Sequence, residues 1–255
     1  MRSGESSVTA LGSADVHVWL LEAPEAASDA RAELCAALLS ADERARMGRF
    51  HFAGDRRRYL FAHALVRTTL SRYAPGTPPA RWRFRTNAHG RPELPPEDGG
   101  PPLRFNLSHT DGLVACAVAL DRDVGVDVEH LWPATFDLGL ARHHFAPAEV
   151  AGLEALPPEA RRARFFALWT LKEAYIKARG LGLALPLERF AFDLEGPAIC
   201  VRFDPELGDE PERWHFARLQ PTAVHALALA ARRVPGETLR VRHWPPPSDF
   251  PGIDS

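Results

Sequence analysis

The short stretch Gly125-Val-Asp127-Val-Glu129 alternates small or apolar residues with acidic ones. On a strand, side chains two positions apart point to the same face with their Cα atoms roughly 6.6 Å apart, so Asp127 and Glu129 share a face. Two carboxylates held this close repel each other unless a cation lies between them, and oxygen ligands suit Mg²⁺ or Mn²⁺. By itself the pattern is weak, because an edge strand with a solvated acidic face also produces it.

Only two of the 31 basic residues are lysines, Lys172 and Lys177, and Glu173 lies beside the first. An ammonium is not interchangeable with a guanidinium, and phosphate sites often use it as a point charge. The residues around them are mostly apolar, which predicts a buried helix, and buried charges need partners or a metal. We therefore expect Glu173 to be a metal ligand among phosphate contacts. A surface pair of Glu173 with Lys177, at i,i+4 spacing, is the common alternative.

A third polar group ends a predicted strand, in Phe105-Asn-Leu-Ser-His-Thr-Asp-Gly112. Ser108 and His109 could be a nucleophile and its base. However, neighbours on a strand usually point apart, and the chain has no G-x-S-x-G elbow there. His109 as a donor to a phosphate fits better than a hydrolase triad, and simple turn chemistry at 110–112 is the alternative.

Composition fits a soluble enzyme with a sizeable core, since 45% of the residues are hydrophobic and 25% are charged. The net charge of −2 gives no overall attraction to nucleic acid. Three widely separated cysteines without metal-ligand spacing predict reduced thiols. No signal-peptide pattern is evident, and the longest apolar run, 113–120, is too short to span a bilayer. We expect a cytoplasmic protein with no membrane or nucleic-acid partner.

Strands and helices occur in separate runs, which indicates an α+β fold class and not a doubly wound sheet. Strands are predicted over 16–21, 81–85, 103–107, 113–120 and 125–129, and a later antiparallel meander over 189–193, 198–203, 213–219 and 224–230. Helices are predicted after N-caps at Ser28 and Ser40, over 55–73, over 138–156 with a break near Pro147, and over 158–179. The polar turn 121–123 divides the chain into halves 1–122 and 123–243, and the Pro-rich tail 244–255 is predicted to be mobile.

Four motifs in this order resemble the 4'-phosphopantetheinyl transferases, and the chain length points to their Sfp-type branch. The motifs are Gly90-Arg-Pro92, Phe105-Asn-x-Ser-His109, Gly125-Val-Asp-Val-Glu129 and Trp169-x-x-Lys-Glu-Ala-x-x-Lys177. The resemblance implies a monomer of two similar α+β halves related by a pseudo-twofold, each a small, mostly antiparallel sheet packed with helices. It also implies that coenzyme A binds in the cleft between the halves.

Carried over by position, the resemblance implies specific roles for residues of this chain. The Mg²⁺ ligands (Mn²⁺ possible) would be Asp127, Glu129 and Glu173. The catalytic residues would be Glu173, Lys177 and His109. The contacts to coenzyme A would be Arg46, Arg58, Arg91, Pro92, Ser108, His109, Lys172 and Lys177. The first half would hold the adenylate and 3'-phosphate, the second half the metal and catalytic motifs, and the general base would be Glu173, water on the metal, or Glu149.

Such an enzyme transfers the 4'-phosphopantetheine group of coenzyme A to a serine of an acyl or peptidyl carrier protein, an acidic helical domain, and releases adenosine 3',5'-bisphosphate. Two other classes stay open. A metal-dependent nuclease or phosphohydrolase also uses clustered acids, but would favour a basic groove and a fourth carboxylate that we cannot locate in the sequence. A carrier-protein- or nucleotide-binding module that lost catalysis is disfavoured by the intact set of three acids.

Overall fold

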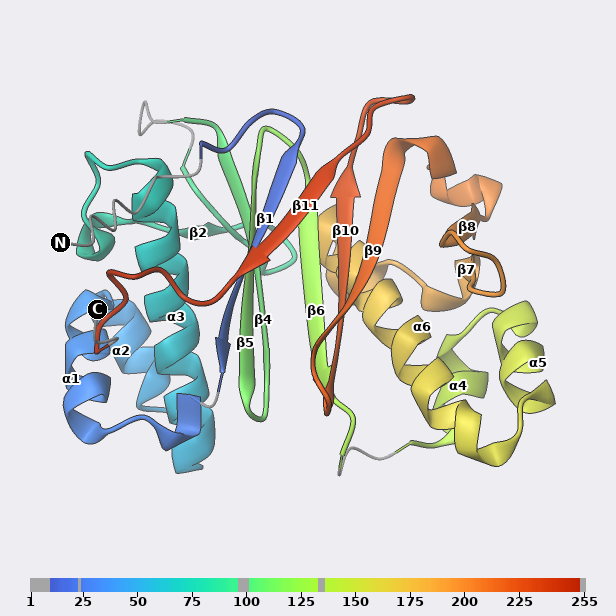
Figure 1. The fold of residues 1–255 in the computed structure, drawn as a ribbon, viewed down its shortest axis with the longest axis horizontal. Helices are drawn as coiled ribbons and strands as arrows, with labels where there is room; N and C mark the ends of the chain where they lie inside the picture. The colour runs from blue at the N-terminus through green and yellow to red at the C-terminus, as the bar shows by residue number, and fades with distance from the viewer. Residues whose placement is uncertain (1–9, 23, 96–100, 133–135, 253–255) are drawn as a thin grey trace, which may run out of the picture. The chain divides into compact units, whose positions relative to one another are not determined.

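The computed structural model describes residues 10–22, 24–95, 101–132 and 136–252 (Figure 1). Contacts divide the chain into two compact units, which we call unit 1 (1–85, 93–121 and 240–255) and unit 2 (86–92 and 122–239). Both units combine small sheets with helices, so the α+β class is confirmed. The pseudo-twofold relation between the halves stays a prediction.

Unit 1 is built on a four-stranded sheet in the order β11-β1-β5-β4. Strand β1 (Asp15–Glu22) pairs antiparallel with β5 (Leu113–Leu120), which pairs antiparallel with β4 (Leu103–Thr110). The long helix α3 (Ala53–Tyr73) packs along this sheet, as Figure 1 shows. Leu60 and Leu65 of this helix are buried in the core of unit 1.

Two short helices precede α3, and both begin at the predicted serine caps. Helix α1 (Asp29–Leu38) starts after Ser28, whose side chain accepts the Arg31 N–H. Helix α2 (Ala41–Met47) starts after Ser40 with a reciprocal capping box: Ser40 accepts the Glu43 N–H, and Glu43 accepts the Ser40 N–H. The caps satisfy N–H groups that the first turn of a helix leaves without partners.

Glu43 also belongs to a buried ion pair that joins α2 to α3. Arg67 is 1% exposed and donates to Glu43 at 2.7 Å and to the carbonyls of Pro79 and Trp82. Burial alone would raise the pKa of Glu43, but hydrogen bonds from His63 and Ser40 and nearby positive charge lower that pKa to about 2. Arg67 is therefore an internal arginine of α3.

The C-terminal tail was predicted to be mobile, and for the described residues this prediction is wrong. Strand β11 (Arg240–Trp244) adds to unit 1 by pairing parallel with β1. Beyond it, Phe250 is 1% exposed in the core, and the Pro251 carbonyl accepts the Arg31 Nε–H at 3.0 Å. The buried Phe250 side chain therefore anchors the tail to unit 1.

Unit 2 is built on a three-stranded antiparallel sheet in the order β6-β10-β9. Helix α6 (Pro158–Arg179) packs on β6 (Val124–His130) and β10 (His225–Arg232), as Figure 1 shows. The remaining elements are β9 (Trp214–Thr222), α4 (Leu138–His144), α5 (Pro147–Ala155), β7 (Phe190–Asp193) and β8 (Cys200–Phe203). The predicted helix break at Pro147 and the helix end at Gly180 are confirmed.

Two strand predictions are wrong. The single meander after α6 is two sheets: in the described part of the chain β7 pairs with β8 alone, while β9 and β10 extend from β6. The stretch 81–85 is a one-turn helix, η2 (Pro79–Arg81), then irregular chain leading to the two-residue strands β2 (Arg85–Thr86) and β3 (Pro92–Glu93). There the Trp82 carbonyl accepts from Arg67 instead of a neighbouring strand.

Five further single-turn helices complete the described chain: η1 (Pro24–Ala26), η4 (Gly182–Ala184), η5 (Leu187–Arg189), η6 (Pro205–Leu207) and η7 (Pro211–Arg213). None of the helices that the structure describes combines the length and the apolar character needed to cross a membrane.

Candidate active site

The site in unit 2 starts from an unusually close contact between β6 and α6. A Cβ added at Gly125 would lie 2.0 Å from the Ala174 carbonyl oxygen and 2.5 Å from the Ala178 nitrogen. The backbone of the helix therefore rests directly on the strand, which only glycine permits. Because side chains alternate along a strand, Asp127 and Glu129 lie on the same face as Gly125, toward α6.

The strand acids meet the charged residues of α6 on this face. Lys177 donates from Nζ to Asp127 Oδ1 at 2.6 Å, and Asp127 is 4% exposed. Glu173 lies one helical turn before Lys177 and is partly buried. Lys177 thus forms an ion pair across the strand–helix contact, and its charge also acts on Glu173.

The three carboxylates influence one another electrostatically. The pKa of Glu129 rises to about 7, mainly through burial and then through the negative charges of Asp127 and Glu173, against the opposing charge of Lys177 and a hydrogen bond from Trp169. Burial, followed by the charge of Asp127, also raises the pKa of Glu173. The acids predicted to converge are therefore close enough to repel one another.

A divalent cation would suit these three side chains. All the ligand atoms would be carboxylate oxygens, which are hard donors, and the cation would relieve the repulsion between them. However, within the ranges that the structure describes, no group of three or more histidine, cysteine, aspartate or glutamate side chains is arranged to hold a metal ion. The ammonium of Lys177 lies against Asp127, one of the three predicted ligands. The metal assignment to Asp127, Glu129 and Glu173 therefore stays a prediction.

Lys172 does not lie in this site, and its predicted contact with a phosphate is wrong. Its side chain is 0% exposed, and Nζ donates to Glu149 Oε2 at 2.7 Å and to the carbonyls of Leu187 and Phe190 at 2.8 and 2.6 Å. All three ammonium hydrogens are thereby used inside the protein. Burial raises the pKa of Glu149 and lowers that of Lys172, each shift being opposed by the charge of the partner.

Glu149 is equally well satisfied, which argues against it as a general base. Its Oε1 accepts the Phe192 N–H at 2.8 Å, and its Oε2 accepts the Ala146 N–H at 3.0 Å as well as Lys172. The pair fastens α5, α6 and β7 together inside unit 2.

Unit 1 holds the other predicted contacts. Ser108 is buried and His109 is exposed on adjacent positions of β4, so they point apart, as predicted, and do not form a nucleophile–base pair. Arg58 forms ion pairs with Asp111, in the turn just after His109, and with Asp55, and Glu25 lies 3.5 Å away. The structure thus brings Arg58 to the turn that follows His109 and surrounds it with acids.

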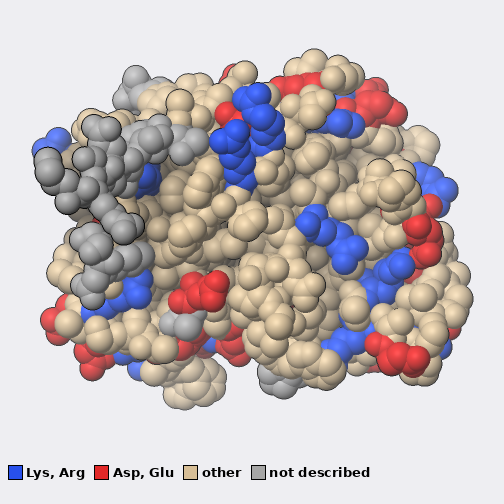
Figure 2. All heavy atoms as spheres, viewed as in Figure 1, with Lys and Arg blue, Asp and Glu red and all other residues tan. Residues whose placement is uncertain are grey.

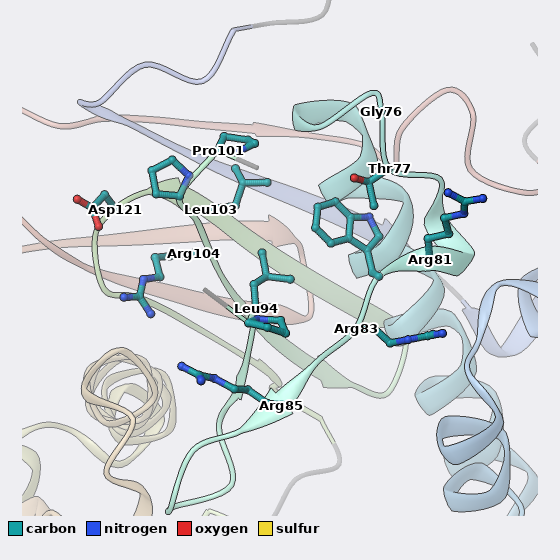
Figure 3. Close-up of a pocket in the computed structure, with 13 residues that line it drawn as sticks. Gly76, Thr77, Arg81, Arg83, Arg85, Leu94, Pro101, Leu103, Arg104 and Asp121 are labelled. Atoms are coloured by element: carbon teal, nitrogen blue, oxygen red, sulfur yellow. The ribbon is translucent and has the colours of Figure 1, made fainter. Parts of the chain in front are cut away.

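Two hollows in unit 1 are lined by arginines. Arg46 and Arg49 line one beside Phe50 at the end of α2. The other has a volume of about 480 Å³ and is shown in Figure 3. In that view Arg81 and Arg83 extend to one side while Arg85 and Arg104 extend to the other, so these guanidinium groups do not converge on one anion. Neither hollow tests the predicted contact of Arg46 with coenzyme A.

The Gly90-Arg91-Pro92 motif lies in unit 2, where Pro92 is exposed and Arg91 faces the end of α6. Arg91 donates from Nη1 to the Ala178 carbonyl at 2.5 Å and lies 3.6 Å from Asp123. The structure therefore gives Arg91 protein partners, and its predicted contact with coenzyme A stays untested.

Comparison with known proteins places this arrangement in a family. Residues 123–230 match the 4'-phosphopantetheinyl transferase superfamily, and residues 26–120 match the N-terminal part of a 4'-phosphopantetheinyl transferase. The 4'-phosphopantetheinyl transferase HetI of Nostoc sp. is 38% identical over 170 residues, covering 67% of this chain and 70% of its own. The chain belongs to the 4'-phosphopantetheinyl transferase superfamily.

Other members of the superfamily agree with this placement. A phosphopantetheinyl transferase of Thraustochytrium sp. is 33% identical over 234 residues, covering 85% of this chain and 78% of its own. The 4'-phosphopantetheinyl transferase Sfp of Bacillus subtilis is 32% identical, covering 61% and 66%. The holo-[acyl-carrier-protein] synthase structure from Thermotoga maritima matches with a TM-score of 0.34 and 22% identity over 44% of this chain and 62% of its own, too low to support an argument.

Sequence reasoning about this 4'-phosphopantetheinyl transferase missed two site features. Trp169 stands in the fourth motif without an assigned role, yet its side chain hydrogen-bonds Glu129 and so holds one of the three acids. The i,i+4 spacing of Trp169 and Glu173 on α6, with Lys177 four residues further, was the available signal, since it places all three on one side of the helix. The partner of Lys172 could not be found this way, because Glu149 is 23 positions away on another helix.

The buried Lys172–Glu149 pair leads to a stability prediction. Lys172→Met keeps most of the side-chain volume but leaves Glu149 buried without its cation, so we expect a loss of about 3–5 kcal/mol in urea unfolding. Lys172→Met combined with Glu149→Leu should recover most of that loss. As a control, Arg142→Met breaks the exposed pair with Glu154 and should cost less than about 1 kcal/mol. Equal effects of Lys172→Met and Arg142→Met would contradict the burial of the pair.

The raised pKa of Glu129 leads to a second prediction, for the protein in chelator. Because folding raises this pKa from its ordinary 4.5 to about 7, the folded protein binds the Glu129 proton more tightly than the unfolded chain. That stabilisation is fully present below pH 4.5 and is lost as the pH rises through 7. The free energy of unfolding of the wild type, relative to Glu129→Gln, should therefore fall between pH 5 and 8. If the difference in unfolding free energy between the two proteins stays constant over this range, the pKa of Glu129 is not raised.

Proposed function

We propose that this protein transfers the 4'-phosphopantetheine group of coenzyme A to a serine of an acyl or peptidyl carrier protein and releases adenosine 3',5'-bisphosphate. The observation that carries the proposal is the convergence of Asp127 and Glu129 with Glu173 and Lys177 across the β6–α6 contact, in a chain that belongs to the 4'-phosphopantetheinyl transferase superfamily. The family membership supports this reaction, and the β6–α6 contact brings together the charged side chains that the reaction would need.

Phosphoryl transfer depends on positioning and on neutralising negative charge. The serine oxygen forms a bond to the β-phosphorus of coenzyme A while the bond from that phosphorus to the bridging oxygen breaks, and adenosine 3',5'-bisphosphate leaves with the electron pair. Lys177 would stabilise the charge that develops on the phosphate oxygens. Glu173, whose pKa is raised, would accept the serine proton.

A metal would complete this charge balance. Asp127, Glu129 and Glu173 would hold Mg²⁺, with Mn²⁺ as a substitute, and the ion would supply charge neutralisation at the pyrophosphate. Lys177 would then have to share Asp127 with the ion, because it occupies Oδ1 in the protein alone.

Residues of unit 1 would contact the rest of coenzyme A. His109, which is exposed on β4, would contact a phosphate, and Ser108 would add a further contact from unit 1. Pro92 would contact coenzyme A from unit 2. Arg46 and Arg58 would bind the 3'-phosphate. Because Arg58 already pairs with carboxylates, that phosphate must compete with Asp55 and Asp111 for the guanidinium.

A metal-dependent nuclease or phosphohydrolase is the second candidate, because it also uses clustered acids. Figure 2 shows basic and acidic side chains in short groups on the face that it draws. The family membership favours the transferase.

The proposed function is tested by incubating apo acyl and peptidyl carrier proteins with the protein, coenzyme A and Mg²⁺, and measuring intact mass. We expect one phosphopantetheine per carrier and one released adenosine 3',5'-bisphosphate. Chelator, Asp127→Ala and Glu173→Gln should each abolish transfer, while Glu154→Gln, a surface acid on α5, should not. Full activity in chelator would exclude the metal, and hydrolysis of coenzyme A without carrier modification would favour the phosphohydrolase.

Lys177 gives a sharper prediction about turnover. Arginine keeps the charge but is planar, bulkier and differently hydrated, so Lys177→Arg should retain the fold and much of the affinity for coenzyme A. It should lose turnover, because the ammonium acts where charge develops in the transition state. Comparing kcat with the affinity for coenzyme A decides the matter, and wild-type turnover in Lys177→Arg would reduce this lysine to a structural partner of Asp127.

A further inference from the structure

The loop formed by residues 86–92 belongs to unit 2, although the chain on either side of it belongs to unit 1. Asn87 closes the loop: its Oδ1 accepts the N–H groups of His89 and Arg91, both at 2.9 Å. Two backbone bonds support the same turn, from Asn87 N–H to the Arg91 carbonyl and from Gly90 N–H to the Asn87 carbonyl, both at 3.0 Å. The loop therefore holds its own shape.

Two side chains of this loop attach it to the C-terminal end of α6. Asn87 donates from Nδ2 to the Gly180 carbonyl at 2.8 Å, and Arg91 donates from Nη1 to the Ala178 carbonyl at 2.5 Å. Carbonyls of the last helical turn have no partner within the helix, and positive charge there is favourable. Ala178 directly follows Lys177, so the attachment point lies next to the proposed site.

The helix end is shaped to receive the guanidinium. Gly180 ends α6 with a left-handed φ of +63°, and a Cβ added there would lie 2.6 Å from Arg91 Cζ and Nε. Glycine is thus required twice at this position, by the backbone conformation and by the packing of Arg91. The side chain of Arg91 is 17% exposed, so most of its surface is already covered by the protein.

We infer that Arg91 is a positioning residue, which docks the 86–92 loop onto the end of α6 and so fixes the loop relative to Lys177. This inference rests on the proposed function and deepens it. It replaces a direct contact between Arg91 and a phosphate, because the guanidinium is engaged with the carbonyl that follows Lys177. If coenzyme A contacts both Pro92 and Lys177, the docked loop fixes the positions of these two residues relative to each other.

Gly180→Ala tests the inference without changing the charge of Arg91. The new methyl displaces the guanidinium from the helix end, so the loop should come loose while Arg91 becomes free for any anion. Docking predicts a rise of about tenfold in the KM for coenzyme A, in Gly180→Ala and in Arg91→Ala alike, with kcat within about twofold, as expected when positioning is lost. The salt dependence of KM should stay that of the wild type, since no phosphate contact is removed.

Gly208→Ala is the matched control. Gly208 also has a left-handed φ, of +61°, and a Cβ there meets nothing within 4 Å, so this variant has the same backbone strain without touching Arg91. Its KM should equal that of the wild type. If Gly180→Ala fails to fold, Asn87→Asp replaces it, because the carboxylate keeps the acceptor that closes the loop but removes the donor to the Gly180 carbonyl.

Amide hydrogen exchange provides a readout that does not depend on activity. The amides of 87–91 should exchange at least about tenfold faster in Gly180→Ala and Arg91→Ala than in the wild type and Gly208→Ala, because the loop opens more often. Unchanged exchange, or an unchanged KM in Gly180→Ala with a weaker salt dependence in Arg91→Ala, would overturn the inference in favour of a direct phosphate contact. A wild type that transfers nothing would refute the proposed function, and exchange alone would then decide the docking.

Discussion

The close contact between Gly125 and the α6 backbone determines the arrangement of the candidate site. With the helix resting on the strand, the face that carries Gly125 also presents Asp127 and Glu129 to Glu173 and Lys177. Any side chain at Gly125 would push α6 outward and separate the acids of the strand from those of the helix. One missing Cβ therefore sets the electrostatics of the site, including the raised pKa values of Glu129 and Glu173.

The two lysines of α6 show how helix geometry separates neighbouring residues. Five positions correspond to roughly 140° around the helix axis, so Lys172 and Lys177 cannot serve the same site. Lys177 faces β6 and the acids, whereas Lys172 faces α5 and β7 and is fully buried with Glu149. The same helix carries a partly exposed charge toward the site and a buried one that fastens unit 2.

Local patterns predicted the elements well where they were long and periodic. The strand 113–120 and the helix 158–179 match β5 and α6 end to end, because alternation and helix punctuation are local signals. Which strands pair is decided by distant parts of the chain, so the separation of β7 and β8 from β9 and β10 could not be read from their order. Composition gave a wrong prediction for the tail. Its many prolines indicated a mobile segment, but the side chain of Phe250 is buried in the core and holds the tail in place.

The two lysines of this chain meet two different structural requirements, and only one of them concerns the candidate site. Arginines of this chain bind backbone carbonyls, as Arg67 does for Pro79 and Trp82 and Arg91 does for Ala178. Lys172 also binds two carbonyls and a carboxylate, but around one nitrogen atom that is fully enclosed. A compact ammonium places three donors around a point, which a planar guanidinium cannot do in the same volume. The small space around the charge therefore explains a lysine at Lys172, and the sequence alone could not show that only Lys177 faces the site.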